Sequence, residues 1–462
     1  MENNANFTNK RKVVNSLGLD LSDALFPPGR RLIPNLNDFY ELELAFYENK
    51  LLSDTELINN GAYFSAAGGE YTHHFLMCTG ETLKLPNGSS SRLKSFFENN
   101  IFRTGYATHG LFPYRGKFHP QMIKGLINIM GLKPDDTVLD PMMGSGTVLV
   151  EASLMGIKSI GFDASPFCQF MTQTKLDTLT MPLVRAKGAL NNCEKVFAYF
   201  EKRVGQPKIA SKINKEKTKK TTLAAMEEVL EYTDNKKKYP LMDKGEDTIK
   251  TYNFLLLAYL DSAGYSERSN KRNPLGQFEA ILERYLFVAD KIQNVLSQLN
   301  IDPAPAKVLE GDARELPLDD DSIDGIVFSP PYSFAIDYLA NDSFHLDYMG
   351  VEVESLRERM VGLSGRNLPE KYQRYREDMV SILSECARVL RRECLCTIIV
   401  GTNSNQLGKV LGVSPHEVAG LHEILIDIGV GFGLKIVKKM SRPITGISNT
   451  MRREYILIFQ KK

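Results

Sequence analysis

Residues 308–339, VLEGDARELPLDDDSIDGIVFSPPYSFAIDYL, decide the fold because they combine strand patterns with an unusual turn. Residues 323–328, IDGIVF, form a short apolar run that is typical of a buried strand. Two prolines follow, and neither can donate an N–H to a sheet. The motif Ser329-Pro330-Pro331-Tyr332 therefore predicts a stiff turn at the carboxyl end of a central strand, where open α/β sheets bind ligands.

A second junction of the same kind lies upstream. Residues 137–140 predict a strand and residues 148–155 a helix, and between them runs Asp140-Pro141-Met142-Met143-Gly144-Ser145-Gly146-Thr147. Glycines let the backbone approach a ligand, and the N–H groups that begin a helix face it. The motif is neither the dinucleotide pattern GxGxxG nor a Walker loop. A carboxylate at the strand tip suits a ligand with an ammonium and a sulfonium, and suits phosphates poorly.

Two further strands end beside acidic residues. Residues 158–163 form the next strand pattern and end at Asp163, and residues 306–310 form the third, followed by Asp312. In a doubly wound sheet, an acid at the tip of the second strand binds ribose hydroxyls, because a carboxylate can accept from both. Asp163 is the candidate for that role.

Together these motifs resemble those of the amino-methyltransferases, which methylate exocyclic amines of nucleobases with S-adenosylmethionine. The D-P-x-x-G-S-G-T sequence is similar to their cofactor motif, and S-P-P-Y is most like the catalytic motif of the N4-cytosine DNA enzymes. The resemblance covers roughly residues 100–170 and 305–460. It implies an α/β fold with a doubly wound, Rossmann-like methyltransferase sheet. Met142-Met143 departs from the family pattern, because an aromatic residue usually stands in that pair.

The resemblance also implies roles for individual residues. Ser329 and the Pro330 carbonyl would hold the target amine, and Tyr332 would stack on a flipped-out base. Phe118 would pack on the methionine arm, with a plain core aromatic as the alternative. Asp312 would accept from the adenine amine, with a solvated turn acid as the alternative. The predicted catalytic residues are Ser329, Pro330, Pro331 and Tyr332. The predicted cofactor-binding residues are Phe118, Asp140, Pro141, Gly144, Ser145, Gly146, Thr147, Asp163 and Asp312.

The spacing of the motifs predicts four regions. Residues 1–100 form an N-terminal extension that contacts nucleic acid or covers the site, and residues 101–170 form the cofactor-binding half. Residues 171–304 separate the second and third strands as a mostly helical, basic insertion, and residues 305–462 form the catalytic half. A long helix is expected at residues 182–204.

Basic loops on the insertion suggest a target-recognition region, by analogy with related enzymes. A solvated charged surface or a linker is the alternative reading. The predicted nucleic-acid-binding residues are Lys215, Lys217, Lys219, Arg268, Lys271 and Arg272. By contrast, Asp319, Asp320, Asp321 and Asp324 are expected to be solvated turn charges.

Composition sets broad limits. The 462 residues exceed what one core usually needs, so two or three subdomains are expected. The 57 basic and 56 acidic side chains leave a net charge of +1, which gives no global indication of nucleic-acid binding. Six scattered cysteines without zinc spacing indicate a reducing, cytoplasmic protein that needs no metal. No apolar run approaches the ~20 residues of a membrane span.

The leading hypothesis is a site-specific DNA methyltransferase that modifies the N4 amine of cytosine in double-stranded DNA. Such an enzyme would belong to a restriction-modification or related system, with a restriction endonuclease as its functional partner. N6-adenine methylation of DNA and guanine-N2 methylation of tRNA are the alternatives within the chemistry. A non-catalytic DNA-binding subunit is the alternative from another class.

Overall fold

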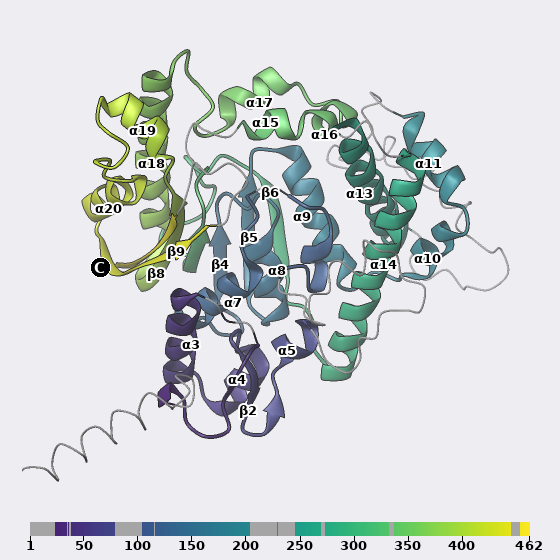
Figure 1. Cartoon of the computed structure of the whole chain (residues 1–462), viewed down its shortest axis with the longest axis horizontal. Coiled ribbons are helices and arrows are strands. Elements are labelled where there is room, and N and C mark those ends of the chain that lie inside the picture. Colours follow the sequence, from purple (N-terminus) through teal and green to yellow (C-terminus); the bar gives the residue numbers. More distant parts are fainter. Residues whose placement is uncertain are drawn as a thin grey trace, which may run out of the picture.

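A seven-stranded sheet organises the chain, in the order β6-β5-β4-β7-β8-β10-β9 (Figure 1). Five strands from β6 to β8 run parallel, and β10 runs antiparallel to both of its neighbours. The strands are β4 (Thr137–Asp140), β5 (Lys158–Asp163), β6 (Ala306–Glu310), β7 (Ile323–Phe328), β8 (Leu390–Gly401), β9 (Leu434–Pro443) and β10 (Arg453–Lys461). The predicted α/β, doubly wound Rossmann-like sheet is confirmed.

This computed structural model describes residues 24–34, 36, 38–78, 104–114, 116–203, 229, 245–268, 273–331, 337–444 and 453–462. Within them, the four strands predicted before residue 330 have the bounds that the sequence indicates. Each is a short apolar run bounded by polar or turn-forming residues, and this local pattern was sufficient to predict where the strand begins and ends.

The strand order reverses between β4 and β7. The chain begins the sheet at β4, adds β5 and β6 on one side, and then returns to place β7 on the other side of β4. Leu139 of β4 lies opposite Ile326 of β7 in parallel register. The turns that follow these two strands therefore leave the sheet side by side, at the position where doubly wound sheets bind ligands.

Helices cover both faces of the sheet. They include α7 (Pro120–Ile129), α8 (Thr147–Leu154), α9 (Pro166–Thr178), α18 (Leu368–Val389), α19 (Ser404–Leu411) and α20 (Leu421–Gly431). Several begin with proline in the first turn, where its missing N–H costs no helical hydrogen bond. Three short helices, α15 (Tyr338–Asn341), α16 (Ser343–Tyr348) and α17 (Val353–Arg359), lie along the top of the molecule in Figure 1.

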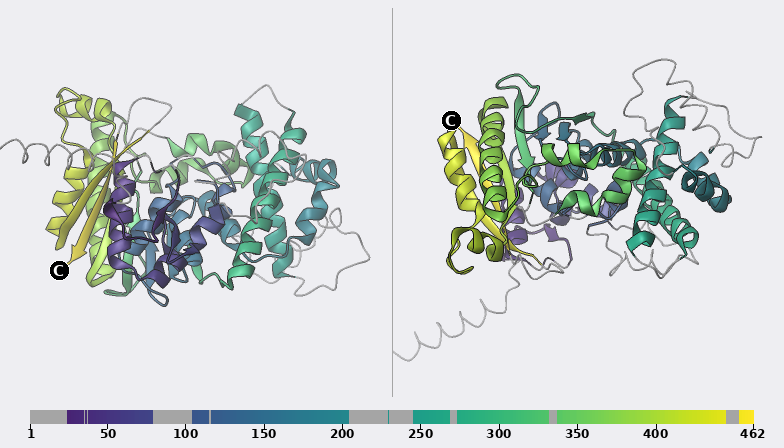
Figure 2. Two further views of the ribbon diagram at one scale, coloured as in Figure 1. Left: turned by 60° about the horizontal axis from the view of Figure 1, so that its bottom comes forward. Right: turned by 90° about the horizontal axis from the view of Figure 1, so that it is seen from above.

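The insertion forms a helical layer at one side of the sheet, away from α18–α20 (Figure 2). It contains α10 (Val184–Leu190), α11 (Cys193–Glu201), α13 (Glu246–Arg268) and α14 (Pro274–Leu299). The long helix expected at residues 182–204 is wrong, because α10 ends before Asn191 and Asn192 has a non-helical backbone with φ −133° and ψ 30°. Asparagine side chains compete with helical hydrogen bonds, which explains a break at this pair.

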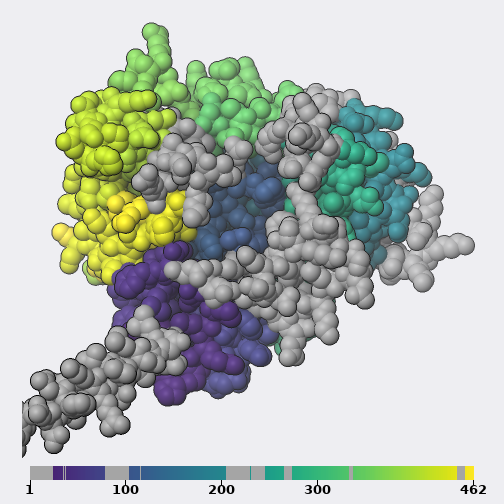
Figure 3. Space-filling view, viewed as in Figure 1, coloured from purple at the N-terminus to yellow at the C-terminus, as the bar shows by residue number. Residues whose placement is uncertain are grey.

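The described part of the N-terminal extension forms a small unit against α7. It contains β1 (Arg31–Leu32), α3 (Phe39–Leu51), α4 (Asp54–Asn60), β2 (Phe64–Ala67), β3 (Glu70–Tyr71) and α5 (His73–Cys78), followed by the short 3-10 helix η1 (Ala107–Gly110). The fully buried Glu48 carboxylate joins this unit to α7 by accepting from Ala62 N, Tyr63 N and Asn128 Nδ2. In the space-filling view the purple surface of this unit lies at the bottom, opposite the green surface of α15–α17 at the top (Figure 3). Within the described residues, no helix has both the length and the apolarity to span a membrane.

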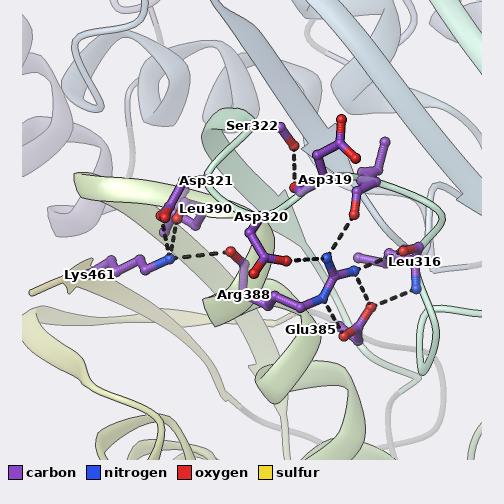
Figure 4. A network of polar contacts seen from close by, with 10 residues as sticks. Leu316, Asp319, Asp320, Asp321, Ser322, Glu385, Arg388, Leu390 and Lys461 are labelled. Atoms are coloured by element: carbon purple, nitrogen blue, oxygen red, sulfur yellow. Dashed lines mark hydrogen bonds and ion pairs between the residues drawn. The ribbon is translucent and has the colours of Figure 1, made fainter.

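The acidic turn before β7 is held by a network around Arg388 at the end of α18 (Figure 4). The guanidinium donates to the Leu316 and Leu318 carbonyls at 2.9 and 2.7 Å and to Asp320 and Glu385 at 2.7 Å each.

Two further aspartates of this turn are also paired. Lys461 of β10 pairs with Asp321 at 2.7 Å, and Asp324 pairs with Arg391 and accepts from Thr137 N at 2.8 Å. The expectation of solvated charges is confirmed for Asp320 and Asp321, whose side chains stay 73% and 53% exposed although each has a cationic partner. It is wrong for Asp324, which is only 14% exposed and paired with Arg391 of β8.

We expect Arg388→Ala to lower the free energy of unfolding by roughly 1–3 kcal/mol, because two main-chain carbonyls and Glu385 lose a charged donor. Urea denaturation of the purified protein measures this change. Arg374→Ala on the same helix is the matched control, since its exposed pair with Glu370 should contribute only a few tenths of a kcal/mol. Equal effects of the two substitutions would contradict the prediction.

Candidate active site

One pocket, with an empty volume of about 870 Å³, lies where β4, β5, β6 and β7 end. It is lined by Tyr114, Gly116, Lys117, Phe118, Pro141, Met142, Met143, Gly144, Ser145, Asp163, Ala164, Gly311, Asp312, Ala313, Ser329, Pro330, Pro331, Tyr338, Arg359, Met360 and Val361. The two motifs found in the sequence therefore face one cavity, as the reversal of strand order requires.

Most of the predicted site residues meet here. Those that line the pocket are Phe118, Pro141, Gly144, Ser145, Asp163, Asp312, Ser329, Pro330 and Pro331. Asp140, Gly146 and Thr147 lie behind its surface, and Tyr332 falls outside the described residues. Phe118 is a core residue that also lines the pocket, and its packing on the methionine arm of a cofactor stays a prediction.

The glycine-rich turn is shaped by two left-handed residues. Gly144 has φ +48° and Gly146 has φ +72°, a region that favours glycine. At Gly146 a Cβ atom would also lie 2.4 Å from the Thr172 side chain, so no larger residue fits against α9. The turn therefore brings its backbone to the pocket wall and begins α8 immediately behind it.

The Asp140 side chain is fully buried and accepts from Met142 N at 3.0 Å. Its Oδ2 has no hydrogen-bond partner within the described residues, and burial raises the pKa of this carboxyl well above its usual range. Asp140 does not line the pocket in this structure, and the presentation of its carboxylate to a ligand stays a prediction. The side chain instead braces the first peptide of the turn.

Asp163 links the tip of β5 to the glycine-rich turn. Its Oδ2 accepts from Gly144 N at 2.9 Å and its Oδ1 accepts from Ser165 N at 2.8 Å. Burial raises the pKa of Asp163 to about 6, although these two N–H donors act in the opposite direction. The carboxylate lines the pocket, and each oxygen retains a lone pair for a further donor.

At the end of β6, Asp312 is held by Arg314. The guanidinium binds both carboxylate oxygens, with the shortest contact at 2.6 Å, and also pairs with Asp378 at 2.8 Å. Burial opposes ionisation, but the hydrogen bonds from Arg314 prevail and hold the pKa of Asp312 below its usual range. Asp312 therefore lines the pocket as an ionised acceptor held by Arg314, with its side chain 36% exposed, and its role toward an adenine amine stays a prediction.

The proline turn presents two oxygens at the end of β7. The half-buried Ser329 donates its hydroxyl to the Pro330 carbonyl at 3.3 Å, and Pro330 itself is buried. Proline fixes φ, so these two oxygens leave the strand at a set spacing. Both are acceptors that a pair of N–H groups from one amine could bind.

Sequence reasoning missed part of the pocket wall. Tyr114, Gly116 and Lys117 lie directly before Phe118, and Arg359 to Val361 lie at the end of α17 and just after it. Lys117 donates to the Thr104 and His109 carbonyls at 2.9 and 2.8 Å, and burial with the nearby Arg284 lowers the pKa of its ammonium to about 8. The residues before Phe118 adjoin a predicted site residue and could have been found from the sequence. Residues 359–361 have no sequence pattern that indicates a site.

The predicted nucleic-acid-binding residues lie largely outside this description. Lys215, Lys217, Lys219, Lys271 and Arg272 are not among the described residues, and Arg268 is described only as the last residue of α13. The described residues of the N-terminal extension do not line the pocket. Across the described ranges, no group of three or more His, Cys, Asp or Glu side chains is placed to hold a metal ion.

Comparisons with known proteins agree with this geometry. Residues 111–236 match the family described as UPF0020, RMKL-like, methyltransferase domain. Over 285 residues the chain is 23% identical to the type II methyltransferase M.BsoBI of Geobacillus stearothermophilus. This alignment covers 54% of each protein. The chain is similar to methyltransferases. The matches support an S-adenosylmethionine-dependent enzyme of this kind.

Two shorter matches have higher identity. Over 68 residues the chain is 46% identical to the type II methyltransferase M.MjaII of Methanocaldococcus jannaschii, covering 15% of this chain and 13% of that one. Over 52 residues it is 40% identical to the tRNA (guanine(10)-N2)-dimethyltransferase of Methanothermobacter thermautotrophicus, covering 11% and 16%. The chain thus spans about half of M.BsoBI and less than a fifth of the other two.

The solved rRNA methyltransferase aviRa of Streptomyces viridochromogenes superposes on 75% of this chain and 87% of its own. The TM-score is 0.32 at 10% identity, so this likeness carries no argument about function.

We expect affinity for S-adenosylhomocysteine to fall about tenfold between pH 7 and pH 5 if Asp163 binds ribose hydroxyls. With a pKa of about 6 the accepting carboxylate dominates above pH 6 and is lost by protonation below it. Isothermal titration calorimetry across this range measures the effect. Asp163→Asn should bind more weakly at pH 7 and show no such pH dependence, and a flat profile for the unaltered protein would refute the role.

Proposed function

We propose that this protein transfers a methyl group from S-adenosylmethionine to the exocyclic N4 amine of cytosine in double-stranded DNA. The observation that carries the proposal is that Gly144 and Ser329, from two motifs far apart in the sequence, line one pocket at the point where the strand order reverses. A donor-binding turn and an amine-binding turn must share a cavity for a methyl group to pass between them.

The pocket has the polarity that this donor needs. Acidic side chains at Asp163 and Asp312 provide acceptors for hydroxyl and amine groups, and the wall also contains the apolar Phe118, Met142 and Val361. When bound, S-adenosylmethionine supplies an activated methyl group on a sulfonium. The Met142-Met143 pair, which departs from the family pattern, is also apolar, and both residues are among those that line the pocket.

The proline turn would activate the substrate amine. The lone pair of such an amine is delocalised into the ring, so the amine is a poor nucleophile until its geometry is changed. Ser329 Oγ and the Pro330 carbonyl, 3.3 Å apart, would accept its two N–H groups and hold the lone pair toward the methyl donor. The target base must leave the duplex to reach this turn, and Tyr332 would stack on it there.

Two observations bear on the choice of substrate. The matched length is greatest with a type II DNA methyltransferase, 285 residues against 52 for the tRNA enzyme, which favours DNA. The serine in the catalytic motif favours cytosine N4 over adenine N6. Guanine-N2 methylation of tRNA is the second candidate, because that relative matches at 40% identity. A non-catalytic DNA-binding subunit fits poorly, since the acceptors of both motifs are present.

The remaining expectations stay predictions. They are the four-region division at residues 1–100, 101–170, 171–304 and 305–462, the nucleic-acid contacts of the insertion, the restriction endonuclease as partner, and a cytoplasmic location. None of them enters the chemistry of the pocket.

The test of substrate uses methyl-labelled S-adenosylmethionine with duplex DNA, single-stranded DNA and tRNA in parallel. Nucleoside mass analysis after digestion should find label in N4-methylcytosine from duplex DNA. Label in N6-methyladenine or N2-methylguanine would replace this proposal by one of the alternatives. Donor binding without transfer to any of the three would favour the non-catalytic reading.

Ser329→Ala should lower kcat by about 10²-fold, because one of the two acceptors that orient the amine is lost. The Kd for S-adenosylhomocysteine should stay within about twofold, since the serine faces the substrate side. Methylation rates and calorimetry measure the two quantities. Ser343→Ala, on the exposed surface of α16, is the matched control and should behave as the unaltered protein. Full activity of Ser329→Ala would overturn the catalytic assignment.

A further inference from the structure

The segment that forms one wall of the pocket contains a strained residue. Phe112 has φ +55°, a left-handed conformation that is unfavourable for a bulky side chain. Its ring is buried against Phe167, with centroids 5.1 Å apart in an edge-to-face arrangement. Such strain persists only where the surroundings enforce it, and it concentrates at functional sites.

The enforcing contacts come from the insertion. Phe112 N donates to the Tyr285 hydroxyl of α14 at 2.8 Å, and that hydroxyl donates to Asp261 of α13 at 3.2 Å. Arg284 donates to the same Asp261 oxygen at 2.6 Å. The side chains of Arg284 and Asp261 are each 2% exposed and Tyr285 is fully buried. A buried ion pair thus fixes the hydroxyl that holds the strained peptide.

The strained peptide in turn sets the pocket wall. Tyr114 N donates to the Phe112 carbonyl at 2.9 Å, and the Tyr114 ring lies against Gly144, 3.7 Å from where a Cβ would stand. The Tyr114 hydroxyl accepts from the Cys168 thiol of α9 at 3.4 Å. Tyr114 also lines the pocket, directly before Gly116 and Lys117. A shift at Phe112 would therefore move the surface that faces the glycine-rich turn.

We propose that Tyr285, with the buried pair Asp261–Arg284, is a positioning group for the methyl-donor pocket. The inference rests on the proposed function and deepens it. The insertion then supports the wall of the donor site from behind, through the hydrogen bond to Phe112, as well as being a candidate recognition region. A displacement of α13 relative to α14 would change the hydrogen bond to Phe112 and, through it, donor binding. No residue of the insertion is among those that line the pocket itself.

The test compares Tyr285→Phe with Tyr259→Phe in the full-length chain. Tyr259 is a buried tyrosine of α13 whose ring packs on Phe197, away from Phe112, so it matches the chemical change without the contact. We expect Tyr285→Phe to raise the Kd for S-adenosylhomocysteine and the KM for the donor about tenfold, with kcat at saturating donor within about threefold. Tyr259→Phe should leave all three unchanged.

A merely structural role would lower the melting temperature but leave the donor affinity of the folded protein unaltered. Folded Tyr285→Phe with unchanged Kd and KM would therefore overturn the inference. If the unaltered protein does not bind S-adenosylhomocysteine, the proposed function itself is overturned.

Hydrogen exchange on the unaltered chain keeps the inference testable if Tyr285→Phe does not fold. Saturating S-adenosylhomocysteine should slow exchange of the Phe112 amide and of α14 around Tyr285, because donor binding and the hold on Phe112 stabilise each other. Protection confined to the glycine-rich turn and the tip of β5, with no change at Phe112 or Tyr285, would count against it.

Discussion

The reversal of strand order between β4 and β7 is the constraint on which the site depends. Parallel strands must return through a helix, so two consecutive strands cannot bring their carboxyl ends together without a crossover. Because the sheet begins at the central strand β4, the chain adds β5 and β6 on one side and β7 on the other. The turns after β4 and β7 therefore lie next to each other at the carboxyl ends of the strands. Backbone pairing of Leu139 with Ile326 then fixes the turns of two distant motifs in one pocket.

Around this edge, acidic side chains are held by backbone or by arginine rather than left to solvent. Gly144 N and Ser165 N hold Asp163, and Arg314 holds Asp312. The two arrangements have opposite consequences for charge. Burial dominates at Asp163 and raises its pKa to about 6, whereas the guanidinium dominates at Asp312 and lowers its pKa. One acid of the pocket thus stays ionised in weak acid while the other becomes protonated.

The sequence was informative where a local pattern determines structure. Apolar runs closed by proline or glycine defined β4 and β7, and the motifs that follow them could be placed without any contact information. The sequence did not predict the burial and contacts that depend on segments far apart in the chain. The burial of Asp140, the pairing of Asp320 with Arg388, and the approach of Arg359 to the pocket each depend on packing that no neighbouring residue announces. The break at Asn192 has a local cause, because asparagine side chains compete with helical hydrogen bonds, but the sequence analysis predicted one helix across it.

The place of the insertion has a physical consequence for the site. It leaves the sheet after α9 and returns at β6, so both of its ends are anchored at strands that carry pocket residues. Its two long helices pack on each other and α14 also contacts η1, which leads directly into the wall at Phe112. An element anchored in this way cannot move as a free module. Because it holds a strained peptide through buried hydrogen bonds, a ligand of the insertion that shifts α13 relative to α14 would act on the pocket through the geometry of Phe112.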